Sequence, residues 1–153
     1  MEFVRKYEKN GYINLEFSAT EEEKIKIDEY CQKIGTSINE LVEKFLVWCV
    51  ENPDEFSKWL KENRDDKLGK GIIGKPVLNR GDKVGFYITP YKEKKEIFCI
   101  GNVEIIDSYG TFEQNEEPSY DIMVENFNNS GERCLVKHVR ESECYNFQQQ
   151  ENP

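Results

Sequence analysis

The chain has 153 residues, of which 37% are hydrophobic and 33% charged, and this length suffices for one ordinary domain or two small ones. Its 21 basic and 30 acidic residues give a net charge of −9, which excludes a protein that coats nucleic acid nonspecifically through a basic surface. The five cysteines are odd in number and include no C-x-x-C pair, so we expect reduced thiols and neither a disulfide framework nor a zinc signature.

The sequence predicts neither a secretion signal nor a membrane span. Its first residues, MEFVRKYEKNGY, lack the apolar stretch of a signal peptide, and no apolar run approaches the ~18 residues that a spanning helix needs. We therefore expect a cytoplasmic protein without a membrane partner.

The first predicted element is a strand in YINLEFSAT, residues 12–20, because apolar and polar side chains alternate there. Its apolar face comprises Ile13, Leu15 and Phe17, and its polar face comprises Asn14, Glu16 and Ser18. No second strand is predicted beside it in this part of the chain, so its pairing partner has to come from elsewhere.

Three helices are expected after this strand. Thr20 places a capping hydroxyl before a run of three glutamates, and carboxylates stabilise the positive start of a helix. Apolar residues then recur at helical spacing up to Gly35, which is a natural helix end. Asn39 is the expected cap of the second helix, and Asn52-Pro53 begins a short third helix over about residues 53–63.

The last two of these helices carry many apolar side chains. The wide stripe on the second helix comprises Leu41, Val42, Phe45, Leu46, Trp48 and Cys49, and the third helix presents Phe56, Trp59 and Leu60. One small neighbouring helix cannot cover the stripe on the second helix, and the excess predicts a second subunit.

The pattern changes from helical to strand-like beyond residue 70. The stretch ENRDDKLGKGIIGKP is rich in charge and glycine, which is typical of a linker at a domain boundary. Segments rich in Val, Ile, Tyr and Phe follow at residues 83–89, 96–106, 119–126 and 133–139, with turn-forming residues between them. We expect a small antiparallel barrel, because closure removes exposed strand edges.

The expected fold class is α+β. The predicted domains are a helical module at residues 1–52, a short helix and linker at residues 53–75, a β-barrel at residues 76–147 and a disordered tail at residues 148–153.

The strand, the helix ending at Gly35 and the helix opening with GTSINELVEKFL together resemble the ribbon-helix-helix family of dimeric DNA-binding proteins. The resemblance covers about residues 12–50, a third of the chain. It is carried by Ile13, Leu15, Phe17, Ile27, Tyr30, Ile34, Gly35-Thr36-Ser37, Asn39-Glu40-Leu41-Val42 and Phe45-Leu46. It implies a homodimer in which the strand pairs with its twin and the two-stranded ribbon enters the major groove of DNA.

The resemblance also assigns roles to residues. It implies a dimer interface of Ile13, Leu15, Phe17, Leu41 and Phe45. It implies DNA contacts by Asn14, Glu16 and Ser18 on the ribbon, by Thr36, Ser37 and Asn39 at a phosphate-binding helix start, and by Arg5 and Lys6. The expected function is a homodimeric transcriptional regulator that binds a DNA operator. Residues 1–50 contain 7 basic and 10 acidic side chains, so the module could also act as a dimerisation clasp without DNA contact.

A second hypothesis starts from the acidic segment DSYGTFEQNEEPSYD, residues 107–121. Its carboxylates and aromatic side chains are Asp107, Tyr109, Phe112, Glu113, Glu116, Glu117, Tyr120 and Asp121. They predict either a solvated loop or a contact surface for a basic partner, such as the nucleic-acid channel of a nuclease.

The stretches RGDKVGFYI and CLVKHVRES resemble parts of small SH3-like barrels in short proteins encoded by phages of Gram-positive bacteria. That resemblance implies, as an alternative function, an anti-CRISPR-like inhibitor of a host defence protein. A phage structural or scaffold protein is a third possibility.

No catalytic site is expected. His138 is the single histidine, so a histidine-based triad has no second candidate, and the Walker, GxGxxG and H-E-x-x-H motifs are absent. Cys134, His138 and Cys144 do not have the spacing of a recognised zinc site. The sequence therefore predicts a protein that is not an enzyme and that uses no metal or cofactor.

Overall fold

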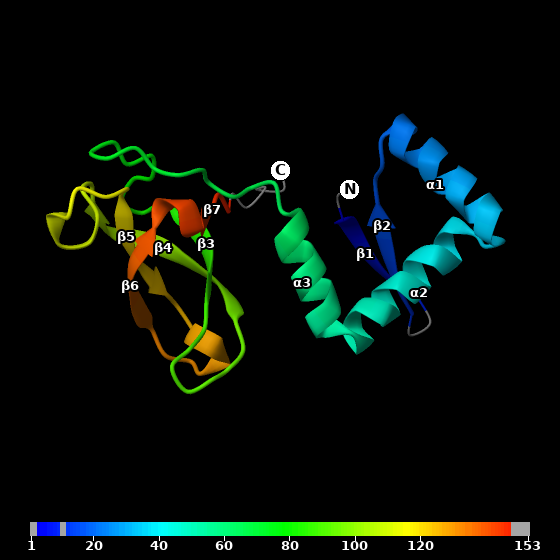
Figure 1. The fold of residues 1–153 in the computed structure, drawn as a ribbon. Coiled ribbons are helices and arrows are strands. Elements are labelled where there is room, and N and C mark those ends of the chain that lie inside the picture. The colour runs from blue at the N-terminus through cyan, green and yellow to red at the C-terminus, as the bar shows by residue number, and fades with distance from the viewer. Residues whose placement is uncertain (1–2, 10–11, 148–153) are drawn as a thin grey trace. The chain divides into compact units, whose positions relative to one another are not determined.

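A computed structural model describes residues 3–9 and 12–147 of the chain, with side chains from residue 15 to residue 147. The chain divides into two compact units, Met1–Asn63 and Arg64–Pro153, and each is described by itself (Figure 1). Among the described residues, the first unit contains a hairpin and three helices and the second a five-stranded antiparallel sheet, so the α+β class is confirmed. The predicted tail at residues 148–153 lies outside the described residues.

The first unit begins with two antiparallel strands, β1 (Phe3–Lys9) and β2 (Tyr12–Phe17). Their register pairs Tyr7 with Asn14 and Glu8 with Ile13. The expectation that this part of the chain offers β2 no partner was wrong. The sequence of β1, FVRKYEK, lacks a clean apolar–polar alternation, which hides the strand from pattern analysis.

Helix α1 (Glu21–Ile34) begins and ends as its sequence predicts. The Thr20 hydroxyl accepts a hydrogen bond from the Glu23 amide, while the Glu23 carboxylate accepts one from the Thr20 amide, which completes a capping box. Gly35 ends the helix with a φ of 75°, a left-handed conformation that costs glycine little because it lacks a Cβ.

Helix α2 (Ile38–Glu51) starts one residue before the predicted cap. Ser37, not Asn39, is the capping residue, and its hydroxyl accepts a hydrogen bond from the Glu40 amide. Helix α3 (Pro53–Asn63) has the predicted limits and carries proline at its first position, where no intrahelical N–H bond is lost.

The sheet of the second unit has the strand order β6-β5-β4-β3-β7. The four predicted strands are confirmed as β3 (Lys83–Ile88), β4 (Ile97–Asp107), β5 (Ser119–Val124) and β6 (Cys134–Arg140). The two-residue β7 (Cys144–Tyr145) was not predicted. Within the described residues no ladder joins β6 to β7, so the sheet is not closed, and the expectation of a closed barrel was wrong.

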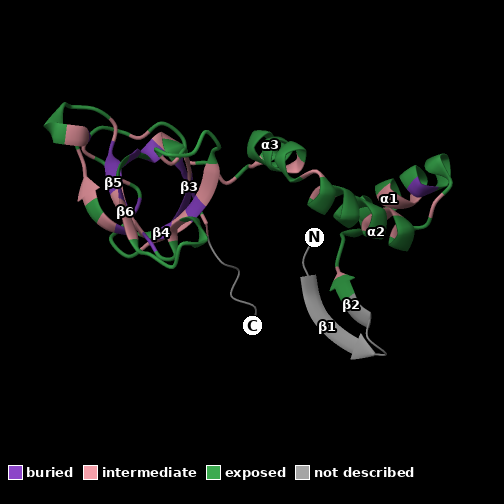
Figure 2. Ribbon diagram, turned by 90° about the horizontal axis from the view of Figure 1, so that it is seen from below, coloured by how far each residue is buried: buried purple, intermediate pink, exposed green. Residues whose placement is uncertain are grey.

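The core of the second unit lies on the inner side of this curved sheet (Figure 2). The largest fully buried side chains are Tyr120, Phe86, Ile122, Val84 and Val103. These five residues come from three strands, which antiparallel pairing brings side by side as β3, β4 and β5. The core is therefore built entirely by residues of the second unit.

The segment expected to be a linker packs against the sheet instead. The Leu68 amide donates to the Cys144 carbonyl at 2.9 Å, and Lys67 forms a bridge with Tyr145. Leu78 is buried in the core. The division between the units consequently falls between Asn63 and Arg64, whereas composition placed it near residue 70.

Candidate functional site

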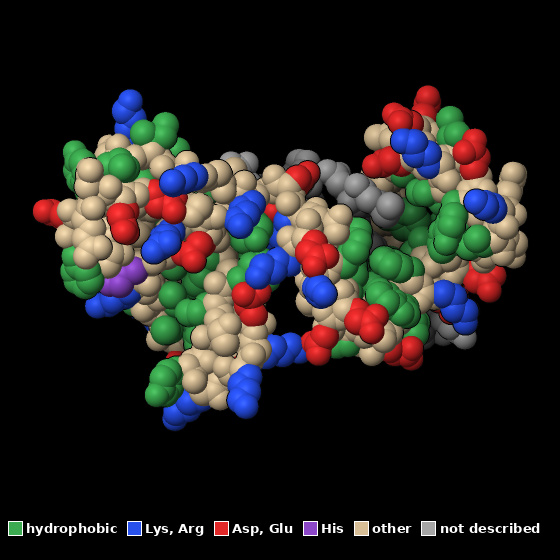
Figure 3. Space-filling view, in the orientation of Figure 1, with side chains coloured by type: hydrophobic (Ala, Val, Ile, Leu, Met, Phe, Trp, Pro, Cys, Tyr) green, Lys and Arg blue, Asp and Glu red, His purple; other side chains and the backbone are tan. Residues whose placement is uncertain are grey.

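The first candidate surface is the apolar face of α2. This helix has no buried residue, although its sequence INELVEKFLVWCVE is largely apolar. Phe45 and Trp48 are 49% and 41% exposed, and Leu46 is also exposed. Hydrophobic side chains are accordingly visible on the face of this unit shown in Figure 3. Within the described residues, a single copy of the chain thus leaves half of the predicted apolar stripe exposed and the other half, Leu41, Val42 and Cys49, partly so.

Aromatic rings continue this surface from α2 onto α3. Phe45 stacks with Trp48 at a centroid distance of 6.2 Å and meets the edge of Phe56 at 6.0 Å, and Phe56 stacks with Trp59 at 6.0 Å. The rings, together with Glu55, line a groove of roughly 510 Å³. In each helix the two aromatic residues are three positions apart, Phe45 and Trp48 in α2 and Phe56 and Trp59 in α3, and this spacing places them on the same face of the helix.

The predicted dimer residues that the structure describes are at least partly accessible. Leu15 is more than half exposed, Phe45 is half exposed, and Phe17 and Leu41 are intermediate. The side chain of Ile13 lies outside the described residues. The structure therefore leaves these apolar residues without the full cover that a core would give them.

The predicted DNA contacts fall into two groups. Glu16 and Ser18 are exposed on and after β2, while the side chains of Asn14, Arg5 and Lys6 lie outside the described residues. The backbone of Arg5 and Lys6 belongs to β1, so the basic residues of the N-terminus are part of the hairpin.

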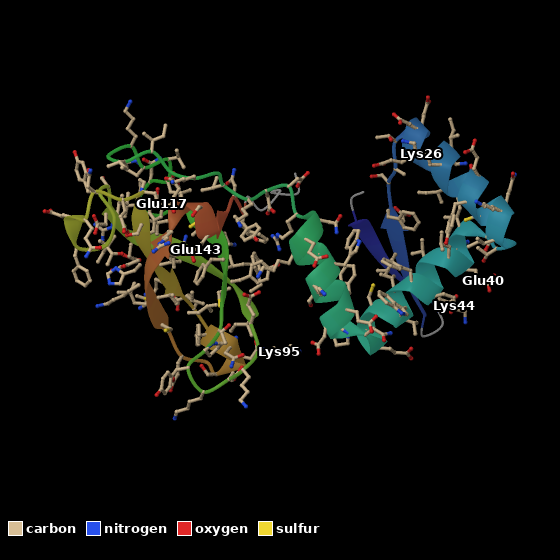
Figure 4. The ribbon with its side chains drawn as sticks, in the orientation of Figure 1. Lys26, Glu40, Lys44, Lys95, Glu117 and Glu143 are labelled. Carbon is tan, nitrogen blue, oxygen red and sulfur yellow. The ribbon has the colours of Figure 1, made fainter. Side chains whose placement is uncertain are left out.

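The second group lies at the start of α2, where free backbone N–H groups attract anions. Here the chain supplies its own carboxylate, because the Thr36 hydroxyl donates to Glu40 Oε2 at 2.9 Å. Ser37 uses its hydroxyl to cap the Glu40 amide, and Asn39 is exposed. Figure 4 labels Glu40 near the start of α2 and Lys44 one turn further on. A phosphate at this place would meet the Glu40 charge.

The acidic segment of residues 107–121 is not one exposed surface. Tyr120 is fully buried, so its assignment to a partner-binding surface was wrong. The Glu117 carboxylate accepts hydrogen bonds from the Gly71 amide, the Ser142 amide and the Ser142 hydroxyl. Asp121 accepts from the His138 amide at 3.0 Å. These three residues stabilise the fold, because their polar groups are used within the unit.

Two carboxylates hold the ends of the loop 71–77. Glu117 binds the Gly71 amide, and the buried Glu141 accepts from the Val77 amide at 2.9 Å and from the Tyr120 hydroxyl at 2.6 Å. Burial, followed by the hydrogen bond to Glu141, raises the pKa of Tyr120, so this hydroxyl remains a donor.

Gly71 is required at this place because the backbone approaches other groups closely. A Cβ there would lie 2.5 Å from Glu141 Oε2 and 2.8 Å from Pro118 Cδ. Beside the loop is an open cleft of roughly 600 Å³, lined by Lys70, Gly71, Ile72, Ile73, Asn115, Glu116, Glu117 and Arg140. Figure 4 labels Glu117 in this part of the unit.

The remaining residues of the acidic segment are accessible. Phe112 is 78% exposed with a φ of 58°, and its ring lies 5.5 Å from that of His138. Tyr109, Glu113 and Glu116 are also exposed, and Asp107 is partly so. The predicted contact surface is thus reduced to these residues.

Cys134, His138 and Cys144 have different surroundings. Cys144 is fully buried, with its Sγ 3.4 Å from the Arg140 carbonyl, whereas His138 is exposed. In the part of the chain that the structure describes, no three Cys, His, Asp or Glu side chains come together as metal ligands. All five cysteines are unpaired thiols.

Sequence analysis missed Glu141 and Gly71 as key residues of the second unit. Nothing in the local sequence RESEC distinguishes Glu141 from its exposed neighbours, because its partners Tyr120 and Val77 are distant along the chain. Gly71 offered a faint signal, since glycine is common where two backbones or side chains approach closely.

The chain matches no protein-family model, no curated protein and no solved structure. None of the helices among the described residues combines the length and apolar character needed to cross a bilayer.

Proposed function

We propose that the protein is a homodimeric DNA-binding regulator whose first unit is a ribbon-helix-helix-type module and whose second unit, an SH3-like sheet, binds a partner. The observation that carries the proposal is the uncovered apolar face of α2. The order of strand, helix with a left-handed glycine end and serine-capped helix supports the family resemblance.

The exposed apolar area suits a dimer. The large exposed side chains on β2 and the three helices include Leu15, Tyr30, Ile34, Phe45, Leu46, Trp48, Trp59 and Leu60. At about half exposure, side chains of roughly 150–250 Å² each leave on the order of 700 Å² for a partner. Stable interfaces bury roughly 600–1,000 Å² per partner, so a second copy that covered most of these side chains would bury an area within that range.

The hairpin supplies the proposed DNA-binding ribbon within one chain. The major groove accepts a two-stranded ribbon, and β1 with β2 is such a ribbon. Its first strand contributes Arg5 and Lys6, so basic residues stand beside the acidic Glu16 of the second. In this proposal dimerisation covers α2 and places two hairpins on one operator, with Asn14 reading base edges.

Dimerisation is tested by sedimentation equilibrium and by tryptophan emission. Both tryptophans, Trp48 and Trp59, lie on the proposed interface, so their emission should shift to shorter wavelength as the concentration rises. Phe45→Asp should prevent both changes, and Lys44→Ala, one residue away on α2, is the matched control. A parent chain that remains monomeric at about 100 μM would contradict the proposal, because interfaces of this size usually bind more tightly.

DNA binding is tested by fluorescence anisotropy with duplexes selected from a random library at about 50 mM salt, where phosphate contacts are strong. Asn14→Ala should remove the sequence preference and leave the dimer intact. Glu40→Gln should tighten binding several-fold by removing the carboxylate at the start of α2, while Glu43→Gln, with the same charge change away from the helix start, should have a smaller effect. A dimer that binds no duplex would contradict the proposed DNA binding and would leave the first unit as a dimerisation module only.

A second candidate function is inhibition of a host defence nuclease by the exposed part of the acidic segment. It is favoured by the high exposure of Phe112 next to Tyr109, Glu113 and Glu116. Phe112→Ala combined with Glu116→Lys should weaken binding to a nuclease with a basic channel by at least about tenfold, as expected for an aromatic anchor and its charge partner. Unchanged affinity in this variant would remove the candidate.

A further inference from the structure

Three aromatic side chains on the second unit form a box. The ring centroids of Tyr87 and Phe98 are 4.9 Å apart, and that of Tyr145 lies 5.4 Å from Tyr87 and 5.9 Å from Phe98. The Tyr145 ring meets the other two at interplanar angles of 79° and 76°. The three rings therefore pack against one another at tilted and edge-to-face angles, and the faces of Phe98 and Tyr145 contact a cation.

The register of the sheet accounts for this box. Tyr87 on β3 lies opposite Phe98 on β4, and Gly85, two residues earlier on the same face of β3, lies opposite Tyr145 on β7. A side chain at Gly85 would overlap the Phe98 ring, so the glycine provides the space that the ring occupies. Core residues such as Phe86 alternate with these positions and point to the opposite face.

The box holds a guanidinium group of the same chain. The Arg64 Cζ lies 4.2 Å from the Phe98 ring centroid and 4.9 Å from that of Tyr145. Its Nε and Nη2 donate to the two oxygens of Asp66 at 3.1 and 3.0 Å, and the Arg64 side chain is only 13% exposed. Hydrogen bonds to Asp66 raise the pKa of Arg64, and Arg64 lowers the pKa of Asp66.

Backbone hydrogen bonds that do not involve Arg64 join residues 66–68 to residues 144–146 beside the box. The Asn146 amide donates to the Asp66 carbonyl at 2.7 Å, and Lys67 and Leu68 pair with β7. The backbone that carries the Asp66 carboxylate and the Tyr145 ring is thus held by hydrogen bonds that do not involve Arg64. The Arg64–Asp66 pair is bidentate and the Arg64 side chain is only 13% exposed, so only a guanidinium that makes the same contacts can replace it.

We propose that this box is a binding site for an arginine side chain of a partner protein, and that Arg64 is its intramolecular competitor. The carboxylate of Asp66 and the face of Phe98 together fit a planar guanidinium, which stacks and forms two parallel hydrogen bonds, better than the compact ammonium of lysine. The site is thus selective for arginine over lysine. A competitor in the same chain acts at an effective concentration in the millimolar range, so it raises the concentration of partner that is needed to occupy the box.

The test uses the full chain, Arg64→Ala to empty the box and Nα-acetyl-arginine methylamide as the probe. Binding is followed by the NMR shifts of the Tyr87, Phe98 and Tyr145 ring protons. The variant should bind the probe at least about fivefold more tightly than the parent and more tightly than the corresponding lysine amide. Adding Phe98→Leu should abolish binding while keeping an apolar side chain at that place.

Arg64→Lys is the second variant and retains a cation next to Asp66. It should bind the arginine probe with an affinity between those of the parent and Arg64→Ala, because lysine competes less well for the box. A folded Arg64→Ala or Arg64→Lys chain without ring shifts, or equal affinity in the parent and both variants, would overturn the proposal. This inference is independent of dimerisation and DNA binding, so its outcome does not depend on theirs.

Discussion

The hydrogen bond between Tyr120 and Glu141 is expected to be among the strongest polar contributions to the stability of the second unit. Both residues are buried, and the hydroxyl donates to the carboxylate at 2.6 Å. In Tyr120→Phe the carboxylate keeps its place but loses this donor. A hydrogen bond to a charged group contributes about 1.5–3 kcal/mol, and in this variant Glu141 Oε1 still accepts from the Val77 amide.

The expected loss in the free energy of unfolding corresponds to a decrease in Tm of roughly 10 °C for a domain of this size. The assay is urea denaturation followed by the NMR signals of backbone amides in β3 to β6, because both tryptophans and the three helices lie in the first unit and do not report on the sheet. The m value should stay unchanged, since the fold is retained.

A double-mutant cycle separates this interaction from the loss of either side chain alone. Tyr120→Phe, Glu141→Gln and the double variant should give a coupling energy of about 1–2 kcal/mol. A cost below about 0.5 kcal/mol for Tyr120→Phe, or a coupling energy near zero, would show that the contact does not stabilise the fold as the burial and distance indicate.

The contributions of Gly71, Glu117 and Cys144 to the stability of the second unit can be measured by the same denaturation assay. Gly71→Ala should destabilise the second unit by about 1–3 kcal/mol because its Cβ would overlap Glu141 and Pro118, whereas Gly69→Ala, which meets nothing within 4 Å, should leave stability nearly unchanged. Glu117→Gln should cost about 1–2 kcal/mol by disturbing the hydrogen bonds to Gly71 and Ser142, and the adjacent exposed Glu116→Gln less than about 0.5 kcal/mol; equal effects would refute the structural role of Glu117. Burial and, next, the Glu141 charge raise the pKa of Cys144 from 9.0 to about 12, so the unfolded chain loses this proton first and stability should fall above about pH 9 by up to about 1.4 kcal/mol per pH unit. Cys144→Ala should flatten this decline between about pH 9 and 10, before tyrosine titrates in the unfolded chain, and an unchanged slope would contradict the assignment.

Much of the secondary structure could be predicted from local patterns. The capping hydroxyl of Thr20, the stop at Gly35 and the proline start of α3 are confirmed because each depends on interactions within one helical turn. The four long strands of the second unit are confirmed for a similar reason, since Val, Ile, Tyr and Phe fit a pleated surface on their own.

The errors concern features that depend on distant residues. Strand β1 was missed because its sequence is dense in charge, and β7 because two residues show no period. Closure of the sheet was expected because several short strands would avoid exposed edges by closing, but register decides closure, and the ladders include shifts within β4–β5 and β5–β6.

The candidate sites follow the same distinction. The exposed stripe of α2 could be predicted from one helix, because composition alone shows more apolar area than the neighbours can cover. The contribution of Tyr120 to the core could not be predicted, because an aromatic residue in an acidic segment looks like an exposed anchor. Its burial depends on a hydrogen bond to Glu141, which is distant in the sequence. The box around Arg64 needs three strands in register and was invisible to sequence reasoning.

The bare helix α2 also has a consequence for protein abundance. If a second copy covers it, the concentration of covered chains rises with the square of total chain concentration when copies are few, and their fraction rises in proportion to it, because two chains must meet. Solitary chains would present Phe45 and Trp48 to chaperones and proteases. Doubling synthesis would then more than double the amount of surviving protein, which makes the cellular level respond sharply to expression.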